Sequence, residues 1–474
     1  MRQRTSCGLY APADLYVSRS FAGSKGRSLA EICGPSLGPA RSSQLRKTFG
    51  IAIVAFSLVG CSQVATLRQS APVSQGAGVV HQIAQQGDGS LWVTITPPQP
   101  LGQSIGIAPG PDGKMWFTQD NLHSVVGKID MSGKVVEYPV SAVPLQIIQG
   151  ADGDLWFIEI DPGAIAKITT SGKLTEYPFP DYGGPSSITA GADGHIWITQ
   201  NNERGVDDSI DKVALDGAIT AYNLPHPKHR HSLFGIAGGP DKSVWFTDQG
   251  TNEIGSVTTR GHFTIFTIPT PNSGAAGIAL GADGNLYFAE SIANKIGEVD
   301  RFGNITEYPV PASDKGPRYI SEGYSGGSMW FDDQDATTGN YQFRQFVIAT
   351  KTFTPVIPPP YASSVPQYLN FGPDGNMWIA DARGPILVAL THVMTSTPAS
   401  LVFSGVGQSQ TIQIHETQYK VRLFTAKSSN QNVATVSDGN QSNSFIVTSL
   451  GAGSCAIHVR DDLGNFIDVG VTIQ

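Results

Sequence analysis

The chain has 474 residues, of which 54 are glycine, 31 are proline and only 15% are charged. This is too long for one ordinary domain and too rich in turn formers for a mainly helical protein, so a β-rich chain with several parts is expected. The formal net charge is −8, and because binding to phosphates needs clustered cations, no nucleic-acid partner is expected.

The first predicted segment is a secretory leader that ends at Cys61. Arg46 and Lys47 precede an apolar stretch over residues 49–59, which is too short to cross a bilayer as a permanent helix. Its ending, Leu-Val-Gly-Cys, resembles the bacterial lipobox, in which the cysteine is lipidated and becomes the new N-terminus. The alternative is a buried core helix that happens to end in cysteine.

The lipobox predicts that residues 1–60 are absent from the mature protein, and residues 1–44 could precede the true start. Residues 61–78 would then form a linker after the lipidated Cys61, and Cys455 would have no disulfide partner within the chain. Two lipid chains give stable anchoring. The expected location is the cell envelope outside the cytoplasm with the membrane as a partner, or secretion.

A phrase of the type Gly-X-Asp-Gly-X-X-aromatic recurs along the chain, with a degraded copy at residues 325–333. Its aromatic anchors are 40 to 48 residues apart and are Trp116, Trp156, Trp197, Trp245, Tyr287, Trp330 and Trp378. A period of this length with strand content predicts propeller blades. Each period reads as four strands: an apolar run, an aromatic strand after the Asp-Gly turn, and two further strands.

The acidic residues of these phrases have two interpretations. The aspartate of each Asp-Gly pair is expected to cap its own hairpin turn, because the spaced oxygen ligands of a calcium loop are missing. Residues 206–211 and 332–335 are interpreted as exposed acidic loops. Calcium binding is the alternative in each case.

The remaining segments complete the architecture. The copy at residues 86–95 lies too close to Trp116 for a full blade, and the last copy lacks a fourth strand. Residues 79–96 are therefore predicted to complete the last blade, closing seven blades over residues 79–395. Short alternating strands over residues 396–474 predict a small β-sandwich that resembles bacterial immunoglobulin-like modules. The predicted fold is an all-β, seven-bladed β-propeller followed by this sandwich.

The repeated phrases "DGxxWFTE", "NKIG" and "EYPxP" resemble the streptogramin B lyase (virginiamycin B lyase) family over about residues 79–392. The resemblance implies a seven-bladed propeller that opens a cyclic depsipeptide antibiotic by elimination at its ester bond. It also implies a magnesium ion and a histidine base.

The family places histidine two positions before the inner-strand isoleucine in two successive blades, and the second of these blades reads Glu-Pro-His there. The seven matching positions of this chain are Ile105, Leu145, Ser186, Phe234, Ala276, Arg318 and Gln367. None is histidine. In the blade around residue 280, Gly274 and Ala276 stand where the family has Glu and His, and only Glu290 matches, as the tentative metal residue. Loss of a general base typically costs about 10² to 10⁴ in rate.

Two groups of residues remain as candidates. Residues 226–231 contain His226, His229 and His231, and the latter two are weak candidates for a displaced catalytic base; a solvated loop is the alternative. The second group is the third residue after each aromatic anchor, predicted to converge as a polar ring that binds a ligand or cation, or that is only structural. This polar ring consists of Gln119, Glu159, Gln200, Asp248, Glu290, Asp333 and Asp381.

These observations leave three functional hypotheses. The first is an envelope lipoprotein whose propeller binds a small molecule, peptide or envelope component as a monomer. The second is an active, magnesium-dependent virginiamycin B lyase-like enzyme. The third is a surface adhesion protein that uses residues 396–474 for recognition.

Overall fold

The computed structural model describes residues 66–69, 74–77, 79–83, 92–98, 102–120, 124–130, 133–160, 163–179, 184–201, 208–225, 231–324, 326–383, 386–389, 394–416, 424–441, 443–461 and 466–474. The leader over residues 1–60 and the candidates Cys61, His226 and His229 lie outside this described part. Its regular elements are β-strands, which confirms the all-β prediction. The described residues also include no helix long and apolar enough to cross a membrane.

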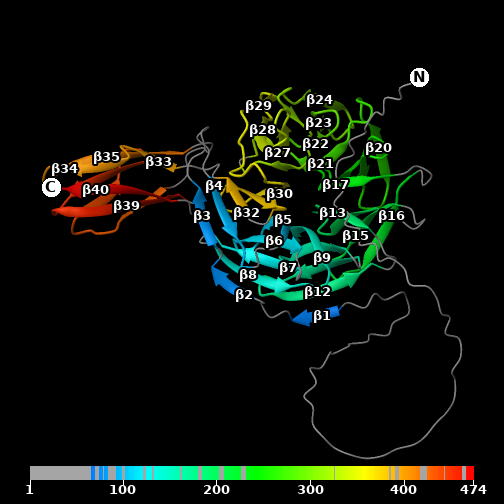
Figure 1. The fold of residues 1–474 in the computed structure, drawn as a ribbon, viewed down its shortest axis with the longest axis horizontal. Helices are drawn as coiled ribbons and strands as arrows, with labels where there is room; N and C mark the ends of the chain where they lie inside the picture. Colours follow the sequence, from blue (N-terminus) through cyan, green and yellow to red (C-terminus); the bar gives the residue numbers. More distant parts are fainter. Residues whose placement is uncertain are drawn as a thin grey trace, which may run out of the picture. The chain divides into compact units, whose positions relative to one another are not determined.

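Seven sheets form the blades of a β-propeller. Their first strands contact one another in order, and the first strand of blade 7 contacts that of blade 1, so the ring is closed. Figure 1 shows these first strands around a common centre. Blade 1 contains β5 (Gln103–Pro109), β6 (Met115–Asp120), β7 (Val125–Ile129) and β8 (Lys134–Pro139). Blade 2 contains β9 (Val143–Gln149), β10 (Leu155–Ile160), β11 (Ala164–Ile168) and β12 (Lys173–Pro178). Blade 3 contains β13 (Pro185–Ala190), β14 (Ile196–Gln200), β15 (Ser209–Val213) and β16 (Ile219–Asn223).

Blades 4 to 6 continue in chain order. Blade 4 contains β17 (Leu233–Gly238), β18 (Val244–Asp248), β19 (Glu253–Val257) and β20 (Phe263–Thr267). Blade 5 contains β21 (Ala275–Leu280), β22 (Leu286–Glu290), β23 (Lys295–Val299) and β24 (Ile305–Pro309). Blade 6 contains β25 (Asp314–Lys315), β26 (Ile320–Glu322), β27 (Ser328–Asp335), β28 (Tyr341–Val347) and β29 (Thr352–Phe353).

Blade 7 combines strands from both ends of the propeller sequence. It contains β30 (Pro366–Phe371), β31 (Met377–Asp381), β32 (Ile386–Ala389), β4 (Trp92–Thr96) and β3 (Val79–Ile83), in that spatial order. Strand β4 pairs antiparallel with β32, with Ile95 opposite Ile386. This pairing covers the edge of β32, which would otherwise be open.

The predicted linker over residues 61–78 is wrong in part, because it contains two strands. β1 (Thr66–Gln69) pairs with β12, and β2 (Ser74–Ala77) pairs with β8, so each adds an outer fifth strand to a blade. The physical reason is that the fourth strand of a blade leaves unpaired backbone groups, to which an extended chain can add.

The hydrophobic cores of the propeller lie between neighbouring blades. In one cluster Trp116 and Tyr138 of blade 1 pack against Leu155 and Phe157 of blade 2, and another joins Phe117 of blade 1 to blade 7. The aromatic anchors are at most 2% exposed. Each blade therefore needs its neighbours to bury its large side chains.

The aspartates of the Asp-Gly turns hold the aromatic anchors. Asp152 Oδ1 accepts a hydrogen bond from Trp156 Nε1 at 3.0 Å, and three other blades repeat this contact. In blade 5 the hydroxyl of Tyr287 donates to Asp283 instead, at 2.8 Å. These contacts agree with the interpretation of these aspartates as turn residues and add a partner that the sequence does not reveal.

The interpretation of the acidic stretches at residues 206–211 and 332–335 as exposed loops is wrong for Asp211, Asp332 and Asp333. Asp332 and Asp333 lie in β27 and are fully buried. Asp211 lies in β15 with its carboxylate bonded to Ser209 and Gln200. Each of these carboxylates lies in a strand and is buried against its neighbours. The number of charges in a stretch of sequence does not reveal this burial.

Residues 394–474 form two further four-stranded sheets around one core. One sheet contains β33 (Met394–Thr397), β35 (Ser409–Glu416), β38 (Ser444–Ser449) and β37 (Ala434–Asp438), and the other contains β34 (Ser400–Phe403), β40 (Phe466–Ile473), β39 (Gly453–Asp461) and β36 (Phe424–Ser428). The immunoglobulin-like assignment stays a prediction.

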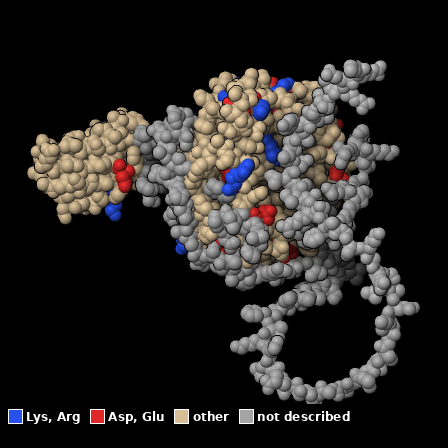
Figure 2. All heavy atoms as spheres, in the orientation of Figure 1, with Lys and Arg blue, Asp and Glu red and all other residues tan. Residues whose placement is uncertain are grey.

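On the face drawn in Figure 2, the described Lys and Arg side chains are scattered rather than gathered.

Candidate functional site

A cavity of about 190 Å³ lies where the first strands of the blades meet. Its lining includes six of the seven positions that the sequence comparison with the family singles out. The lining residues are Ile105, Leu145, Ser186, Phe234, Arg318, Tyr319, Gln367 and Tyr368. Equivalent positions of successive blades therefore meet at one place, because the first strand of each blade is the one closest to the axis.

A second cavity, of about 150 Å³, is lined by residues further along the same strands. The two cavities share Phe234, Tyr319 and Tyr368 in their linings. Polar groups of this second lining include Gln146 and Ser187, which are hydrogen-bonded to each other at 2.7 Å. Together the cavities form an axial site whose lining combines apolar side chains with polar ones, among them Ser186, Arg318 and Gln367.

Arg318 and three aromatic rings dominate the first cavity. The Arg318 guanidinium lies 5.3 Å from the centre of the Phe234 ring and 5.1 Å from that of Tyr319. Tyr319 in turn packs on Tyr368, with ring centres 4.7 Å apart. Burial raises the pKa of Tyr368 to about 12, so its phenol stays neutral at physiological pH.

Blade 5 carries the positions that match the family's second motif. Ala276 is buried and belongs to a hydrophobic cluster with Tyr287. Gly274 has a φ of +71°, and a Cβ at this position would lie 2.7 Å from Ile292 Cγ1. The local backbone therefore does not accept a glutamate at position 274 without rearrangement.

Glu290 ends β22 in the same blade and is fully buried. Burial, followed by the charge of nearby Glu307, raises the pKa of Glu290 to about 8. Glu307 is itself held by Lys295 at 2.7 Å and by the hydroxyl of Thr270 at 2.8 Å. At neutral pH Glu290 is therefore mostly protonated.

The residues around Glu290 do not fit the magnesium ion that the family implies. Magnesium binds several oxygen ligands, mostly ionised carboxylates and waters, in octahedral geometry, whereas Glu307, the carboxylate whose charge acts on Glu290, is already neutralised by Lys295 at 2.7 Å. Within the described ranges, no group of three or more His, Cys, Asp or Glu side chains could hold a metal ion.

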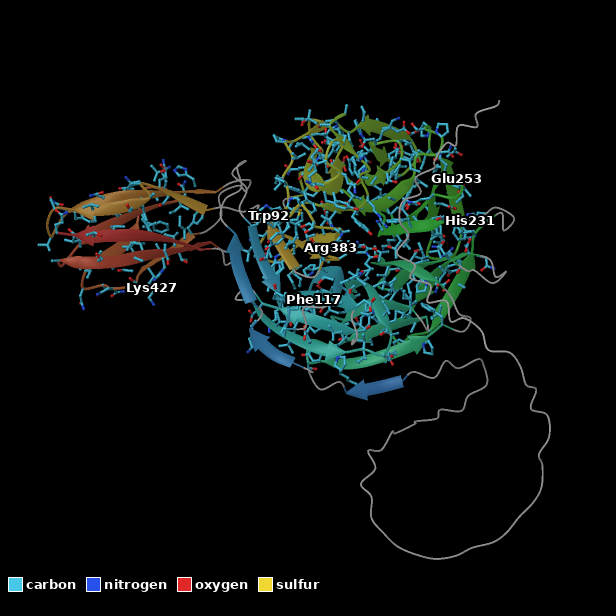
Figure 3. The ribbon with its side chains drawn as sticks, in the orientation of Figure 1. Trp92, Phe117, His231, Glu253, Arg383 and Lys427 are labelled. Carbon is cyan, nitrogen blue, oxygen red and sulfur yellow. The ribbon has the colours of Figure 1, made fainter. Side chains whose placement is uncertain are left out.

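His231, labelled in Figure 3, is oriented by Asp248 of blade 4. Its Nδ1 lies 2.5 Å from Asp248 Oδ2, and their side chains are 6% and 2% exposed. Asp248 Oδ1 accepts the backbone N–H groups of Ser232 and Gly250, each at 2.9 Å. The His231 Nε2 atom is buried and has no hydrogen-bond partner among the described residues. An imidazole oriented in this way by a carboxylate can accept or donate a proton at Nε2.

The polar ring is fully buried, and none of its seven members lines either cavity. The members lie toward the C-terminal ends of the second strands, one strand further from the axis. Asp381, for example, accepts the backbone N–H groups of Val365 and Arg383. Burial raises the pKa of Asp333 to about 7 despite nearby Arg344. The expected convergence at a channel mouth is thus not seen at these cavities, and a ligand-binding role stays a prediction.

Sequence reasoning did not identify Arg318, Tyr319 and Tyr368 as site residues. Arg318 stands out in the sequence only as a position without histidine, and no motif marks the two tyrosines. The available signal was the position itself, since six of the seven equivalent residues line this cavity. The fold and the site together define a β-propeller with an aromatic, arginine-containing cavity on its axis.

Residues 98–389, more than half of the chain, match the Virginiamycin B lyase family. The chain belongs to this family. It is 28% identical over 182 residues to virginiamycin B lyase of Nocardia farcinica (strain IFM 10152), a match that covers 38% of this chain and 61% of that protein.

Solved structures of the family agree with this assignment. The structure of virginiamycin B lyase from Staphylococcus aureus is 31% identical, covers 63% of this chain and 98% of that one, and has a TM-score of 0.56. A catalytically inactive histidine-to-alanine variant of the same enzyme, solved with quinupristin, matches equally well. Loss of one histidine is thus linked to inactivity in that protein.

Proposed function

We propose that this chain is a ligand-binding propeller of the cell envelope that has kept the family's scaffold and lost its catalytic base. One observation carries the proposal. The positions where the family resemblance places histidine in successive blades hold Phe234 and Ala276, and Phe234 lines the axial cavity beside Arg318. The phenyl ring of Phe234 supplies contact area for a ligand, and neither this ring nor the buried methyl group of Ala276 can accept a proton.

The other groups near these positions do not supply the missing chemistry. Elimination needs a base that is unprotonated at the working pH and an electrophile for the developing charge. Glu290 is mostly protonated at neutral pH. The cavity of about 190 Å³ is also smaller than the roughly 300 to 1,000 Å³ that encloses a drug-sized ligand, so the expected ligand is a smaller molecule or one group of a larger one.

The test combines turnover and binding on the purified chain. With a streptogramin B substrate and magnesium, we expect no ring opening above a buffer control, under conditions in which the Staphylococcus aureus enzyme is active. A small-molecule screen by thermal shift should give ligands whose effect is lost in Gln367→Trp, which fills the cavity. Thr220→Trp, on the exposed face of β16, is the control. Efficient turnover by the chain, or ligands unaffected by Gln367→Trp, would refute the proposal.

The envelope location rests on the lipobox-like segment Leu-Val-Gly-Cys at residues 58–61. A lipid anchor at Cys61 is part of the proposal. Cys61→Ala should move the protein from the membrane fraction to the soluble fraction of the cell. An unchanged membrane fraction in this variant would remove the anchor from the proposal without affecting the cavity.

A second candidate, an active lyase, is favoured by the contact between His231 and Asp248. Here His231 Nε2 would be a displaced base, and Glu290 would serve as an acid because it is protonated at neutral pH. If turnover is detected, His231→Ala should abolish it. Activity that survives this substitution would exclude His231 as the base.

A further inference from the structure

Among the described residues, Arg318 is the one charged residue that lines the first axial cavity. Its side chain is exposed, and within the described part of the chain its guanidinium forms no ion pair or hydrogen bond with another side chain. Because the side chain is exposed, its N–H donors are solvated, and the acceptor atoms of a ligand can replace that water. The Arg318 guanidinium borders the cavity, so its N–H donors are available to a ligand bound there.

The surroundings hold Arg318 in place. Its carbonyl oxygen accepts the backbone N–H of Gly277 in the neighbouring blade, at 2.8 Å. The next residue, Tyr319, donates its backbone N–H to Asp332 Oδ1 at 2.6 Å. The guanidinium itself lies near the rings of Phe234 and Tyr319, so cation–π attraction restricts its orientation before a ligand binds.

The charge balance favours a ligand with one negative charge. Asp332 is buried behind this loop, and burial raises its pKa to about 6, so at neutral pH its charge offsets part of that of Arg318. A phosphate dianion would need further cations or a group of backbone N–H donors. A carboxylate matches the planar fork of a single guanidinium with two parallel hydrogen bonds.

We propose that the axial cavity binds a small organic monoanion, with its carboxylate on Arg318 and an aromatic or apolar body against Phe234, Tyr319 and Tyr368. This inference rests on the proposed binding function and specifies its ligand class. The other lining residues include Ile105, Leu145 and Gln367, which leave room for an apolar body and offer no second charge.

The test uses two probes of nearly equal shape, phenylacetate and the neutral phenylacetamide, with affinities measured by ligand-observed NMR on the full chain. Because a charge-assisted pair is lost, Arg318→Gln should weaken phenylacetate binding about ten- to a hundredfold. Phenylacetamide binding should change less than about threefold. Arg301→Gln is the matched control, because Arg301 also lies over a phenyl ring, that of Phe302 at 4.6 Å, but does not line the cavity.

The outcomes separate this inference from the proposed function. If Arg318→Gln leaves phenylacetate binding unchanged, or neither probe binds, the inference is wrong. If both probes bind equally and Gln367→Trp blocks both, the binding function stands and the anion preference does not. Thermal unfolding checks that Arg318→Gln folds; if it does not, Arg318→Lys replaces it, and a loss confined to phenylacetate is again the expected result.

Discussion

The Nδ1 atom of His231 lies 2.5 Å from Asp248 Oδ2, and both side chains are almost fully buried at the junction that leads into blade 4. Asp248 also fastens that junction, because its other oxygen accepts backbone N–H groups on both sides. One carboxylate thus orients an imidazole and closes a loop.

This arrangement predicts a large loss of stability in Asp248→Ala. The substitution leaves the N–H groups of Ser232 and Gly250 and the ring of His231 without their acceptor, which should cost about 2 to 4 kcal/mol. Asp248→Asn keeps one acceptor oxygen and should cost less. Denaturant unfolding measures both, and a double-mutant cycle with His231→Ala should show coupling. Additive effects of the two substitutions would contradict the contact.

Blade stability should depend on the bond between Asp152 and Trp156. Asp152→Ala leaves the buried indole N–H without its acceptor and should cost about 1 to 3 kcal/mol, whereas Asp152→Asn should lose less because an acceptor remains. Asp216→Ala is the matched control, since Asp216 caps an exposed turn that holds no tryptophan. Equal losses in Asp152→Ala and Asp216→Ala, measured by urea unfolding, would show that the indole bond contributes little.

A related prediction concerns the glycine that opens each repeated phrase. In Gly150→Ala the new Cβ would lie 2.5 Å from Trp156 Cδ1, so the ring or the turn must move. We expect a lower melting temperature, with a loss of about 1 to 3 kcal/mol from overpacking. Gly405→Ala, where no atom lies within 4 Å of the new Cβ, is the comparison. A similar melting temperature for the two variants would rule out the close approach.

Glu290 predicts a pH-dependent stability. Its pKa is raised from 4.5 to about 8 in the folded chain, so between these values the folded state holds a proton that the unfolded state releases. This contribution is fully present below pH 4.5 and is lost as the pH rises to about 8, by up to about 1.4 kcal/mol per pH unit. Glu290→Gln should therefore reduce the decline in stability between pH 5 and 8. Melting curves across this range, with Glu253→Gln as a second carboxyl-to-amide change, decide the matter; a wild-type slope in Glu290→Gln would contradict the raised pKa.

Closure of the ring should depend on Trp92 (Figure 3). This fully buried residue of β4 packs in a cluster with Trp330, Phe343 and Leu387. Trp92→Ala should cost about 3 to 5 kcal/mol and promote aggregation, because loosening β4 exposes the edge of β32. Val93→Ala on the same strand should be milder, as Val93 is only partly buried. Unfolding and light scattering measure the two effects, and a stable, monodisperse Trp92→Ala protein would be evidence against closure by this strand.

The repeated phrase made the blades predictable from the amino-acid sequence alone. In the period around Tyr287, the predicted aromatic strand and the two further strands that follow it correspond to β22, β23 and β24. Local rules suffice there, because an Asp-Gly turn and an alternating strand specify their hairpin within about twenty residues. The same rules do not show which side chains meet across blades, so neither the partner of His231 nor the burial of Asp332 and Asp333 could be predicted.

The amino-acid sequence by itself determined the blade repeat, the resemblance to the family and the absence of histidine at the family's positions, since these properties depend on residue identity and spacing. The tertiary structure decided which positions face the axis. It placed Arg318 and three aromatic rings in a cavity, and it placed the polar ring one strand away inside the blades. The physical reason is that the axis exists only where the first strands of different blades pack against one another, and these contacts join segments far apart in the sequence.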